Sequence, residues 1–176
     1  MTGQTVIAYW LIPSEPAHSF FQRIINHLAR RYDAPVFEPH LTIYIGADRA
    51  DAAEKALWDA ARKCNPLGLI PIGTDQSDEF IKTLFVQFAT SAELRKASDI
   101  ICEAANDSSQ YELKPHLSLL YKSLAAETRR ELAASIDVAF SEVTFNAIKA
   151  VRCNSPTRTR VEVDAWQIIT EEKFSR

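Results

Sequence analysis

The sequence predicts a fold of two lobes, each rich in βαβ units, that face one another across one cleft. Three observations lead to this prediction. Segments with the apolar periodicity of strands and of helices alternate along the chain. The tripeptide Pro-His-Leu occurs twice, at residues 39–41 and 115–117. The elements around the first copy recur around the second at a separation of about 76 residues, which indicates an internal duplication.

The first half of the chain is expected to form three strands and two helices. Residues 5–12 are β-branched and aromatic, a composition that favours a strand. Ser14 can cap the helix that follows, with Pro16 in its first turn, because a serine oxygen accepts from a free N–H at a helix start. The remaining elements of this half are a strand at 40–46, a helix from Asp48 to a stop at Asn65-Pro66, and a strand at 67–74.

The second half repeats that order. Its expected elements are a strand at 80–89, a helix capped by Ser91, a strand at 116–121, a helix at about 124–138, and strands near 142–151 and 159–170. We therefore expect one domain over residues 1–176, with lobe 1 at about 1–75 and lobe 2 at about 76–176. An alternative is that the C-terminal strand returns to pair with lobe 1.

Composition limits the classes of function. The chain has 176 residues, 20 Lys and Arg against 23 Asp and Glu, and a formal net charge of −3. Proteins that bind long nucleic acids through charge carry a basic excess, so we expect no such partner. A small phosphorylated substrate remains compatible with this charge, because a phosphate pocket needs only a few well-placed donors. We expect a monomer that acts on such a small molecule.

The same residues predict a location. No segment approaches the roughly 18 consecutive apolar residues of a membrane span. The first residues lack the basic segment and the small-residue cleavage site of a secretion signal. The cysteines Cys64, Cys102 and Cys153 are widely spaced and form no CxxC pair. We expect a cytoplasmic protein, away from membranes, whose cysteines are buried structural thiols.

The repeated tripeptide is followed each time by a hydroxyl residue. Side chains at positions i and i+2 of a strand lie on the same face, so His40 projects with Thr42, and His116 projects with Ser118. The leucine between them faces the core in each case. If the lobes are related by a pseudo-twofold axis, two imidazoles and two hydroxyls converge across the cleft.

This combination suits displacement at phosphorus. A base activates the nucleophile on one side of the phosphorus atom, and an acid protonates the leaving oxygen on the other. Histidine, with a pKa of about 6.5, serves in either role near neutral pH. Ser and Thr hydroxyls donate to the non-bridging oxygens. The scheme needs no metal or other cofactor, and the sequence shows no ligand cluster that would indicate one.

A structural interpretation competes with the catalytic one. A single His-Leu-Thr on a strand is most often structural, but a second copy at the equivalent position of a duplicated unit reverses that interpretation. His18 and His27 flank the apolar stripe of the first helix, where surface or boundary positions are usual. A solvated face explains the basic cluster of Arg152, Arg158 and Arg160 better than a diphosphate site does.

The chain resembles the 2H phosphoesterase superfamily, whose signature is two His-x-Thr/Ser motifs, one in each lobe. Here these motifs are His40-Leu41-Thr42 and His116-Leu117-Ser118. Within the superfamily, the chain is similar to the cyclic phosphodiesterases of plants and fungi. The segments that carry this similarity are residues 9–13, 37–42 and 115–121, and the resemblance extends over most of the chain.

The resemblance implies a bilobal α+β fold with antiparallel sheets around a central cleft. It implies a metal-independent hydrolase that opens a ribose cyclic phosphate to a phosphomonoester. The implied substrates are nucleoside 2′,3′-cyclic phosphates and the ADP-ribose 1″,2″-cyclic phosphate of tRNA-splicing metabolism. By position, His40 and His116 form the acid/base pair, with His116 activating water, while Thr42 and Ser118 hold the phosphate. Tyr121 matches a tyrosine of the phosphate site.

Two aromatic residues leave alternatives open. Tyr121 lies five residues after His116, so strict alternation places it on the opposite face. It reaches the cleft only if the strand ends or bulges near Leu120, and otherwise it is a core or rim residue. Trp10 is more often a core residue at such a position, and its alternative role is to line the pocket for a base or a ribose.

Two further functions remain open. An RNA-end enzyme that acts on terminal cyclic phosphates or 2′–5′ linkages needs a basic track beside the cleft, which the net charge of −3 supports little. A nucleotide or RNA-end binding module without turnover would retain the fold alone. The presence of both complete motifs disfavours this second alternative.

Overall fold

The computed structural model describes residues 3–107 and 109–175. This part of the chain contains eight strands, five α-helices and one 3₁₀ turn. In chain order they are β1 (Gln4–Pro13), α1 (Ala17–Tyr32), β2 (Leu41–Ala47), α2 (Ala50–Lys63), β3 (Leu67–Leu69), β4 (Pro71–Gln76), η1 (Phe80–Lys82), β5 (Leu84–Phe88), α3 (Ala92–Ala105), β6 (His116–Leu120), α4 (Ala126–Ser135), β7 (Val143–Ser155), α5 (Arg160–Asp164) and β8 (Gln167–Lys173).

The strands form one antiparallel sheet in the order β3-β7-β1-β2-β6-β5-β4. β8 pairs with β7 on the edge opposite β1, beyond the short pairing of β3. The two strands that carry the histidine motifs, β2 and β6, are neighbours in the middle of this order. A single register pair, Leu41 with Leu117, joins them. Because each leucine directly follows a motif histidine, this junction brings the two motifs together.

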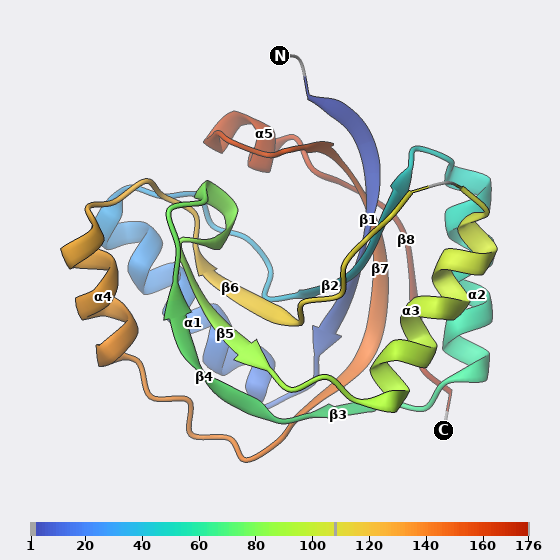
Figure 1. Ribbon diagram of the computed structural model, residues 1–176, viewed down its shortest axis with the longest axis horizontal. Coiled ribbons are helices and arrows are strands. Elements are labelled where there is room, and N and C mark those ends of the chain that lie inside the picture. Colours follow the sequence, from blue (N-terminus) through green and yellow to red (C-terminus); the bar gives the residue numbers. More distant parts are fainter. Residues whose placement is uncertain (1–2, 108, 176) are drawn as a thin grey trace.

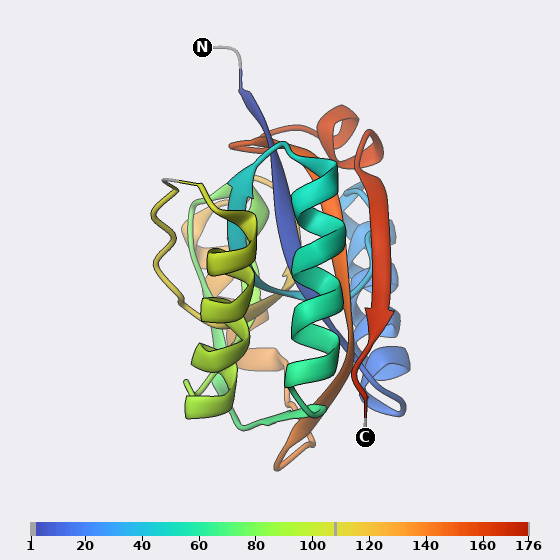
Figure 2. The same ribbon diagram turned by 90° about the vertical axis from the view of Figure 1, so that its right-hand side faces the viewer.

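The sheet curls, and helices cover it in two pairs. β3 and β4 lie at opposite ends of the strand order, but only Ile70 separates them in the chain, so the two ends of the sheet meet there. Helices α1 and α4 flank the half that contains β4, β5 and β6, and α2 and α3 flank the other half (Figure 1). Figure 2 shows α2 and α3 side by side. The result is the α+β arrangement with antiparallel strands that the sequence predicted.

The two halves of the chain exchange elements. β7 and β8, from the second half, extend the sheet beyond β1, so the C-terminal strands return to the first strand. In the opposite direction, α1 packs against β6, and α3 packs against α2 and β2. The spatial halves therefore do not coincide with residues 1–75 and 76–176, because β7 pairs with β1 along the whole length of β1.

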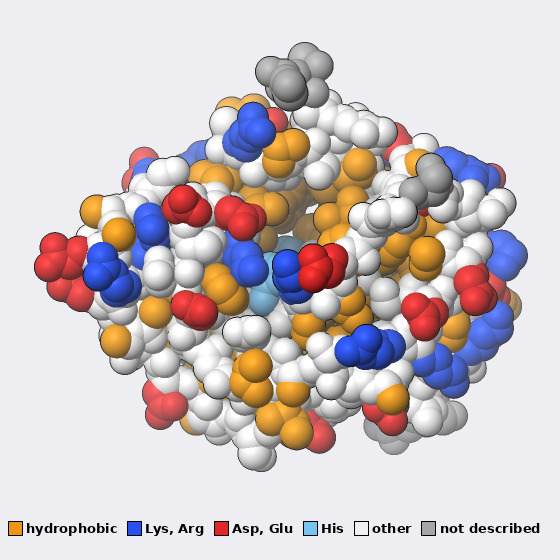
Figure 3. Space-filling model, in the orientation of Figure 1, with side chains coloured by type: hydrophobic (Ala, Val, Ile, Leu, Met, Phe, Trp, Pro, Cys, Tyr) orange, Lys and Arg blue, Asp and Glu red, His pale blue; other side chains and the backbone are white. Residues whose placement is uncertain are grey.

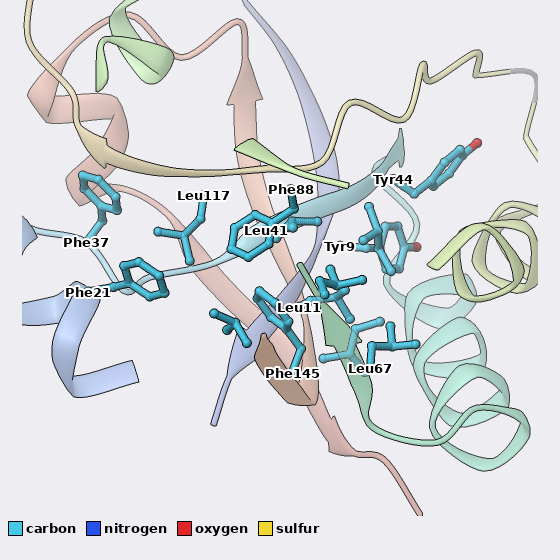
Figure 4. Packing of buried hydrophobic residues seen from close by; sticks show 14 of the residues in the cluster. Tyr9, Leu11, Phe21, Phe37, Leu41, Tyr44, Leu67, Phe88, Leu117 and Phe145 are labelled. Atoms are coloured by element: carbon cyan, nitrogen blue, oxygen red, sulfur yellow. The ribbon is translucent and has the colours of Figure 1, made fainter. Parts of the chain in front are cut away.

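Strand alternation separates two hydrophobic clusters. On β1, Ile7, Tyr9 and Leu11 enter the main core, which Figure 4 shows packed with residues from α1, β2 and β7. Ala8, Trp10 and Ile12 alternate with them and belong to a second, smaller cluster on the other face. The main core fixes the sheet, and the second cluster forms part of the pocket described below.

Hydrogen bonding changes two of the expected helix starts. The Ser14 hydroxyl donates to the Thr144 carbonyl at 3.1 Å and caps no helix, because the end of β1 is held against the start of β7. Helix α1 begins after Pro16 without a side-chain cap. Asp48 does not start α2 either, since its carboxylate pairs with Arg152. The Ser91 cap of α3 is confirmed, as its side chain accepts from the Leu94 N–H at 3.1 Å.

Three expected strands are wrong in part. The segment 67–74 divides at Ile70 into β3 and β4, which pair with different partners. The segment 80–89 begins with η1, and strand β5 starts only at Leu84. The segment 159–170 begins with α5, because Thr159 and Glu162 form a capping box, and β8 starts at Gln167.

In the described ranges 3–107 and 109–175, none of the helices combines the length and the apolar character needed to cross a membrane.

Candidate active site

The junction of β2 and β6 places the two motif histidines at one pocket. His40 immediately precedes β2, and His116 is the first residue of β6. The residues that line the pocket are Val6, Ala8, Trp10, His40, Thr42, Ile45, Ile81, His116, Ser118, Tyr121, Cys153, Asn154, Ser155, Thr157 and Trp166. The six site residues expected from the sequence therefore line one pocket: Trp10, His40, Thr42, His116, Ser118 and Tyr121. Figure 3 shows histidine atoms at the bottom of a hollow in this face of the molecule.

Both histidines are held in the same way. Nδ1 of His40 lies 2.7 Å from the Glu38 carbonyl, and Nδ1 of His116 lies 2.7 Å from the Lys114 carbonyl. A carbonyl oxygen can only accept, so each Nδ1 carries the hydrogen and donates it. In the neutral imidazole this leaves Nε2 as an unprotonated acceptor. The two motifs thus present matched tautomers, each with Nε2 available for proton transfer.

Burial keeps both imidazoles neutral. His40 is 7% exposed, and burial lowers its pKa from 6.5 to about 4, although the nearby charge of Glu38 opposes the shift. His116 and Lys149 lower the pKa of His40 further. Burial also lowers the pKa of His116, with the Lys114 carbonyl opposing. Near neutral pH the free protein therefore holds two neutral histidines.

Aromatic side chains enclose His40. The Trp10 indole stacks on the imidazole with ring centroids 3.7 Å apart and planes 14° from parallel. Trp166, at the turn before β8, packs edge-on to Trp10, His40 and Tyr121. Trp10 is thus both a buried residue and a pocket-lining residue, which joins the two alternatives that the sequence left open.

Sequence reasoning missed Trp166. Its indole Nε1 is a buried side-chain nitrogen without a hydrogen-bond partner within the described residues. The residue belongs to neither motif and lies in the segment expected to be a strand, so only its aromatic type near the C-terminus gave any signal. The Trp166 residue itself lines the pocket.

Tyr121 reaches the pocket because β6 ends at Leu120 and its register with β5 shifts near that end. The condition stated from the sequence, a strand end or bulge near Leu120, is therefore met. Phe37 stacks on the Tyr121 ring with centroids 3.7 Å apart. Burial raises the pKa of Tyr121 well above its ordinary value, although a hydrogen bond with Ser118 opposes the shift. The phenol therefore stays protonated and can act as a donor.

The two motif hydroxyls differ in their surroundings. The Ser118 hydroxyl donates to the Ile81 carbonyl at 2.7 Å, so it is tied to the segment before β5. Thr42 lines the pocket from β2 and lies in register with Trp10 on β1. A donor for a ligand is thus available at Thr42, whereas Ser118 must first turn away from Ile81.

A charged cluster lies behind His40. Lys149, only 8% exposed on β7, contacts both carboxylate oxygens of Glu38 at 2.7 and 3.0 Å. His18 approaches the same carboxylate at 3.4 Å, and Glu171 lies 3.7 Å from Lys149. Because the Glu38 carbonyl accepts from His40, this cluster fixes the backbone that orients the imidazole. His18 thus contacts the cluster and does not line the pocket.

The remaining candidates lie elsewhere. His27 lines a separate groove between α1 and α4. Arg152 pairs with Asp48, and Arg160 pairs with Asp33, so neither lines the pocket. Cys64 is buried, whereas Cys102 and Cys153 are only half-buried, and all three are free thiols. In the part of the chain that the structure describes, no three His, Cys, Asp or Glu side chains gather as a metal site would require.

Two adjacent strands that present matched histidine and hydroxyl side chains to one pocket define a 2H phosphoesterase. The chain belongs to the family of cyclic phosphodiesterase-like proteins, whose model matches residues 5–174. Membership places it among the phosphodiesterases, as the paired motifs predicted.

Known proteins agree with this assignment. The chain is 24% identical to the cyclic phosphodiesterase of Arabidopsis thaliana over 170 residues, which cover 93% of this chain and 92% of the relative. Its fold is similar to that of Escherichia coli LigT in complex with 3′-AMP, with a TM-score of 0.58, 16% identity and full coverage of both chains. It is also similar to the protein TT0787 of Thermus thermophilus, with a TM-score of 0.61, 16% identity, and coverage of 96% of this chain and 97% of the other.

Proposed function

We propose that the protein hydrolyses a ribose cyclic phosphate to a phosphomonoester by a two-histidine acid/base reaction that needs no metal. The substrates that fit are nucleoside 2′,3′-cyclic phosphates and ADP-ribose 1″,2″-cyclic phosphate. The observation that carries the proposal is that the two imidazoles make the same hydrogen bond. Each donates its Nδ1–H to the backbone carbonyl two residues before it. Each Nε2 is then left for the reacting groups in one shared pocket.

The proposed reaction adds water across one P–O bond of the cyclic phosphate. One imidazole takes a proton from water as the new P–O bond forms, and the other gives a proton to the ribose oxygen as the old bond breaks. The resemblance to the superfamily assigns the first step to His116 and the second to His40. Because both imidazoles are neutral in the free protein, the bound phosphate supplies the negative charge that stabilises the required proton.

The phosphate would be held by uncharged donors. Thr42, Ser118 and Tyr121 line the pocket with the histidines, and their hydroxyls can donate to the non-bridging oxygens. Trp10 would form the wall beside the ribose. Uncharged donors match a substrate that carries a single negative charge and a product that must leave with two.

The relatives support a small nucleotide substrate. The relative from Arabidopsis thaliana is named cyclic phosphodiesterase. Escherichia coli LigT has been crystallised with 3′-AMP, with ATP and with NADP+. We extend this to a monomeric cytoplasmic enzyme of small phosphorylated nucleotides that does not engage long nucleic acids.

The test is turnover of adenosine 2′,3′-cyclic phosphate and of ADP-ribose 1″,2″-cyclic phosphate in the presence of EDTA. We expect hydrolysis, and we expect His40→Ala and His116→Ala each to lower kcat by at least about 100-fold. His27→Ala, which changes a histidine in a separate groove, is the matched control. Full activity in both pocket variants would remove the catalytic assignment, and loss of activity with EDTA would reject the metal-free reaction.

An oligonucleotide that ends in a 2′,3′-cyclic phosphate completes the panel. Strong preference for it over the mononucleotide would make the protein an RNA-end enzyme. Binding of every substrate without hydrolysis would make it a binding module. The first result would contradict the proposed small substrate, and the second would contradict the proposed hydrolysis.

A further inference from the structure

Helices α1 and α4 enclose a groove that shares none of its described lining residues with the histidine pocket. The lining comes from α1 between residues 20 and 31 and from residues 132–136 at the end of α4. The groove has a volume of about 330 Å³. This value lies within the range of about 300–1,000 Å³ that ligand pockets occupy. Large side chains of a partner therefore have room to enter the groove.

The greater part of this lining is apolar and is only partly covered. Leu28 and Leu132 are buried, whereas Phe20, Ile24 and Ile136 are half-buried. Phe20, Ile24 and Leu28 follow one another at intervals of four residues, so α1 presents a continuous apolar row along the groove. An apolar surface laid on this row would remove it from water, which favours association.

One side of the groove carries a row of basic side chains. Arg23, His27 and Arg31 line it and are exposed. They also follow one another at intervals of four residues, which places them about 6 Å apart along the helix axis. Within residues 3–107 and 109–175, neither arginine forms an ion pair with a carboxylate. None of the described residues that line the groove is Asp or Glu.

The charge of α1 is opposite to that of the whole chain. Helix α1 contains three arginines and two histidines but no Asp or Glu, whereas the chain has a net charge of −3. Basic residues in the last turn of a helix interact favourably with its dipole, and this accounts for Arg30 and Arg31. The dipole effect does not extend to Arg23 or His27, which precede the last turn. The basic row as a whole therefore matches an external row of negative charges.

An amphipathic helix with acidic residues beside its apolar face combines both complements. The apolar side chains of such a helix enter a groove at spacings of three and four residues. Carboxylates placed four residues apart on it recur at about 6 Å, the spacing of the basic row. A fatty acid also has an apolar part, but its single carboxylate would match only one position of the row.

We infer that the groove between α1 and α4 is a docking site for a partner protein. The partner presents an amphipathic helix whose apolar face is flanked by Asp or Glu. Because the groove and the histidine pocket have separate linings, docking leaves the pocket open. The inference does not depend on the proposed function.

The test uses designed helical peptides of about 15 residues that carry a fluorescent label. Each has a leucine face and a flanking row at positions i, i+4 and i+8, which holds glutamate, glutamine or lysine. Fluorescence anisotropy gives their dissociation constants with the full chain. We expect the glutamate peptide to bind at least about tenfold more tightly than the glutamine peptide at low salt. Added salt should reduce this difference.

Charge reversal of the row tests the complementarity directly. The double variant Arg23→Glu/Arg31→Glu should prefer the lysine peptide to the glutamate peptide. Arg95→Glu/Arg130→Glu is the matched control, because it changes the net charge equally at exposed arginines on α3 and α4 that do not line the groove. This control should keep the preference of the wild type. Equal binding of the glutamate and glutamine peptides by the wild type would overturn the inference, and so would an unchanged preference in the folded Arg23→Glu/Arg31→Glu protein.

Folding and location need their own measurements. Circular dichroism shows whether the double variant folds. If it does not, Arg23→Gln and Arg31→Gln should each weaken binding of the glutamate peptide by about threefold, and unchanged binding in both would overturn the inference. Amide chemical shifts in the presence of the glutamate peptide should change along α1 and α4. Changes centred on His40 and His116 would overturn the location.

Other occupants give different results. Dodecanoate that shifts the amides of α1 and α4, while the glutamate peptide fails to bind, would assign the groove to a fatty acid and overturn the inference. Sedimentation velocity tests a second copy of the chain as the occupant. Self-association of the wild type that Arg23→Glu/Arg31→Glu abolishes would overturn the inference in favour of a dimer.

Discussion

The indole of Trp10 lies flat against the imidazole of His40, with ring centroids 3.7 Å apart and ring planes 14° from parallel. Trp10 also meets the edge of Trp166, and Trp166 meets the edge of His40. Water is therefore kept from one face of the imidazole by a neutral ring. This explains in part why burial dominates the low pKa of His40, about 4, in spite of the nearby Glu38 charge.

Replacing Trp10 with leucine should raise the pKa of His40 from about 4 toward its ordinary value of 6.5. The smaller side chain admits water to the imidazole, and solvation favours the protonated form. The measurement is an NMR titration of the imidazole Cε1–H signals. The signal of His27, which lies outside the pocket, is the internal reference. An unchanged His40 titration in a folded Trp10→Leu protein would contradict this explanation.

The same pKa predicts a loss of stability in acid. Between pH 6.5 and about 4 the unfolded chain binds a proton at His40 and the folded protein does not, so the free energy of unfolding falls as the pH falls. The full effect amounts to about 3 kcal/mol at the lower end of this window. The lowered pKa of His116 adds a contribution of the same sign.

Urea unfolding across this pH window measures the effect. His40→Asn removes the titrating group, so its free energy of unfolding should depend less on pH than that of the wild type. Equal slopes for the two proteins would show that the pKa of His40 is not depressed in the folded state.

The sequence predicted the strands with local patterns and missed the features that depend on distant contacts. Composition identified β1, because residues 5–12 are β-branched and aromatic. The expected cap at Ser14 and the expected helix start at Asp48 were wrong because Thr144 and Arg152, both on β7, bind those side chains. No local pattern records a partner more than 100 residues away.

The candidate site was predictable because its residues were duplicated. Two copies of a short motif gave His40 and His116, and the structure places both at one pocket. Trp166 was missed because a single aromatic residue outside a motif carries no such signal. The contact of Lys149 with Glu38 could not be foreseen either, since it depends on the pairing of β7 with β1. Repetition in a sequence reveals a site, whereas the residues that support it come from the fold.

Removing either charge of the ion pair between Glu38 and Lys149 should lower the stability of the protein, but by unequal amounts. Glu38→Gln leaves the ammonium of Lys149, a side chain only 10% exposed, without its main partner, and should cost about 2 kcal/mol of stability. Lys149→Met removes the charge and keeps the aliphatic packing, while the Glu38 carboxylate, 29% exposed, retains water. We expect this second change to cost less, about 1 kcal/mol.

The two variants should also move the pKa of His40 in opposite directions. Glu38 raises this pKa and Lys149 lowers it, so Glu38→Gln should lower the value and Lys149→Met should raise it. Chemical unfolding and the NMR titration give both quantities from the same proteins. A shift in the same direction in both variants would mean that altered backbone position, and not charge, controls His40.

Removing the hydroxyl of each motif should affect stability in one case only, but activity in both. Ser118→Ala removes the hydrogen bond to the Ile81 carbonyl and the hydrogen bond with Tyr121, so it should cost about 1 kcal/mol of stability. Thr42→Val keeps the shape of the side chain and should change stability little. If both hydroxyls bind the phosphate, kcat/KM for a cyclic phosphate should fall about tenfold in each variant. Thermal unfolding and steady-state kinetics on the same samples measure the two effects. A Thr42→Val protein with wild-type kcat/KM would remove this residue from the phosphate site and leave Ser118 and Tyr121 as the donors.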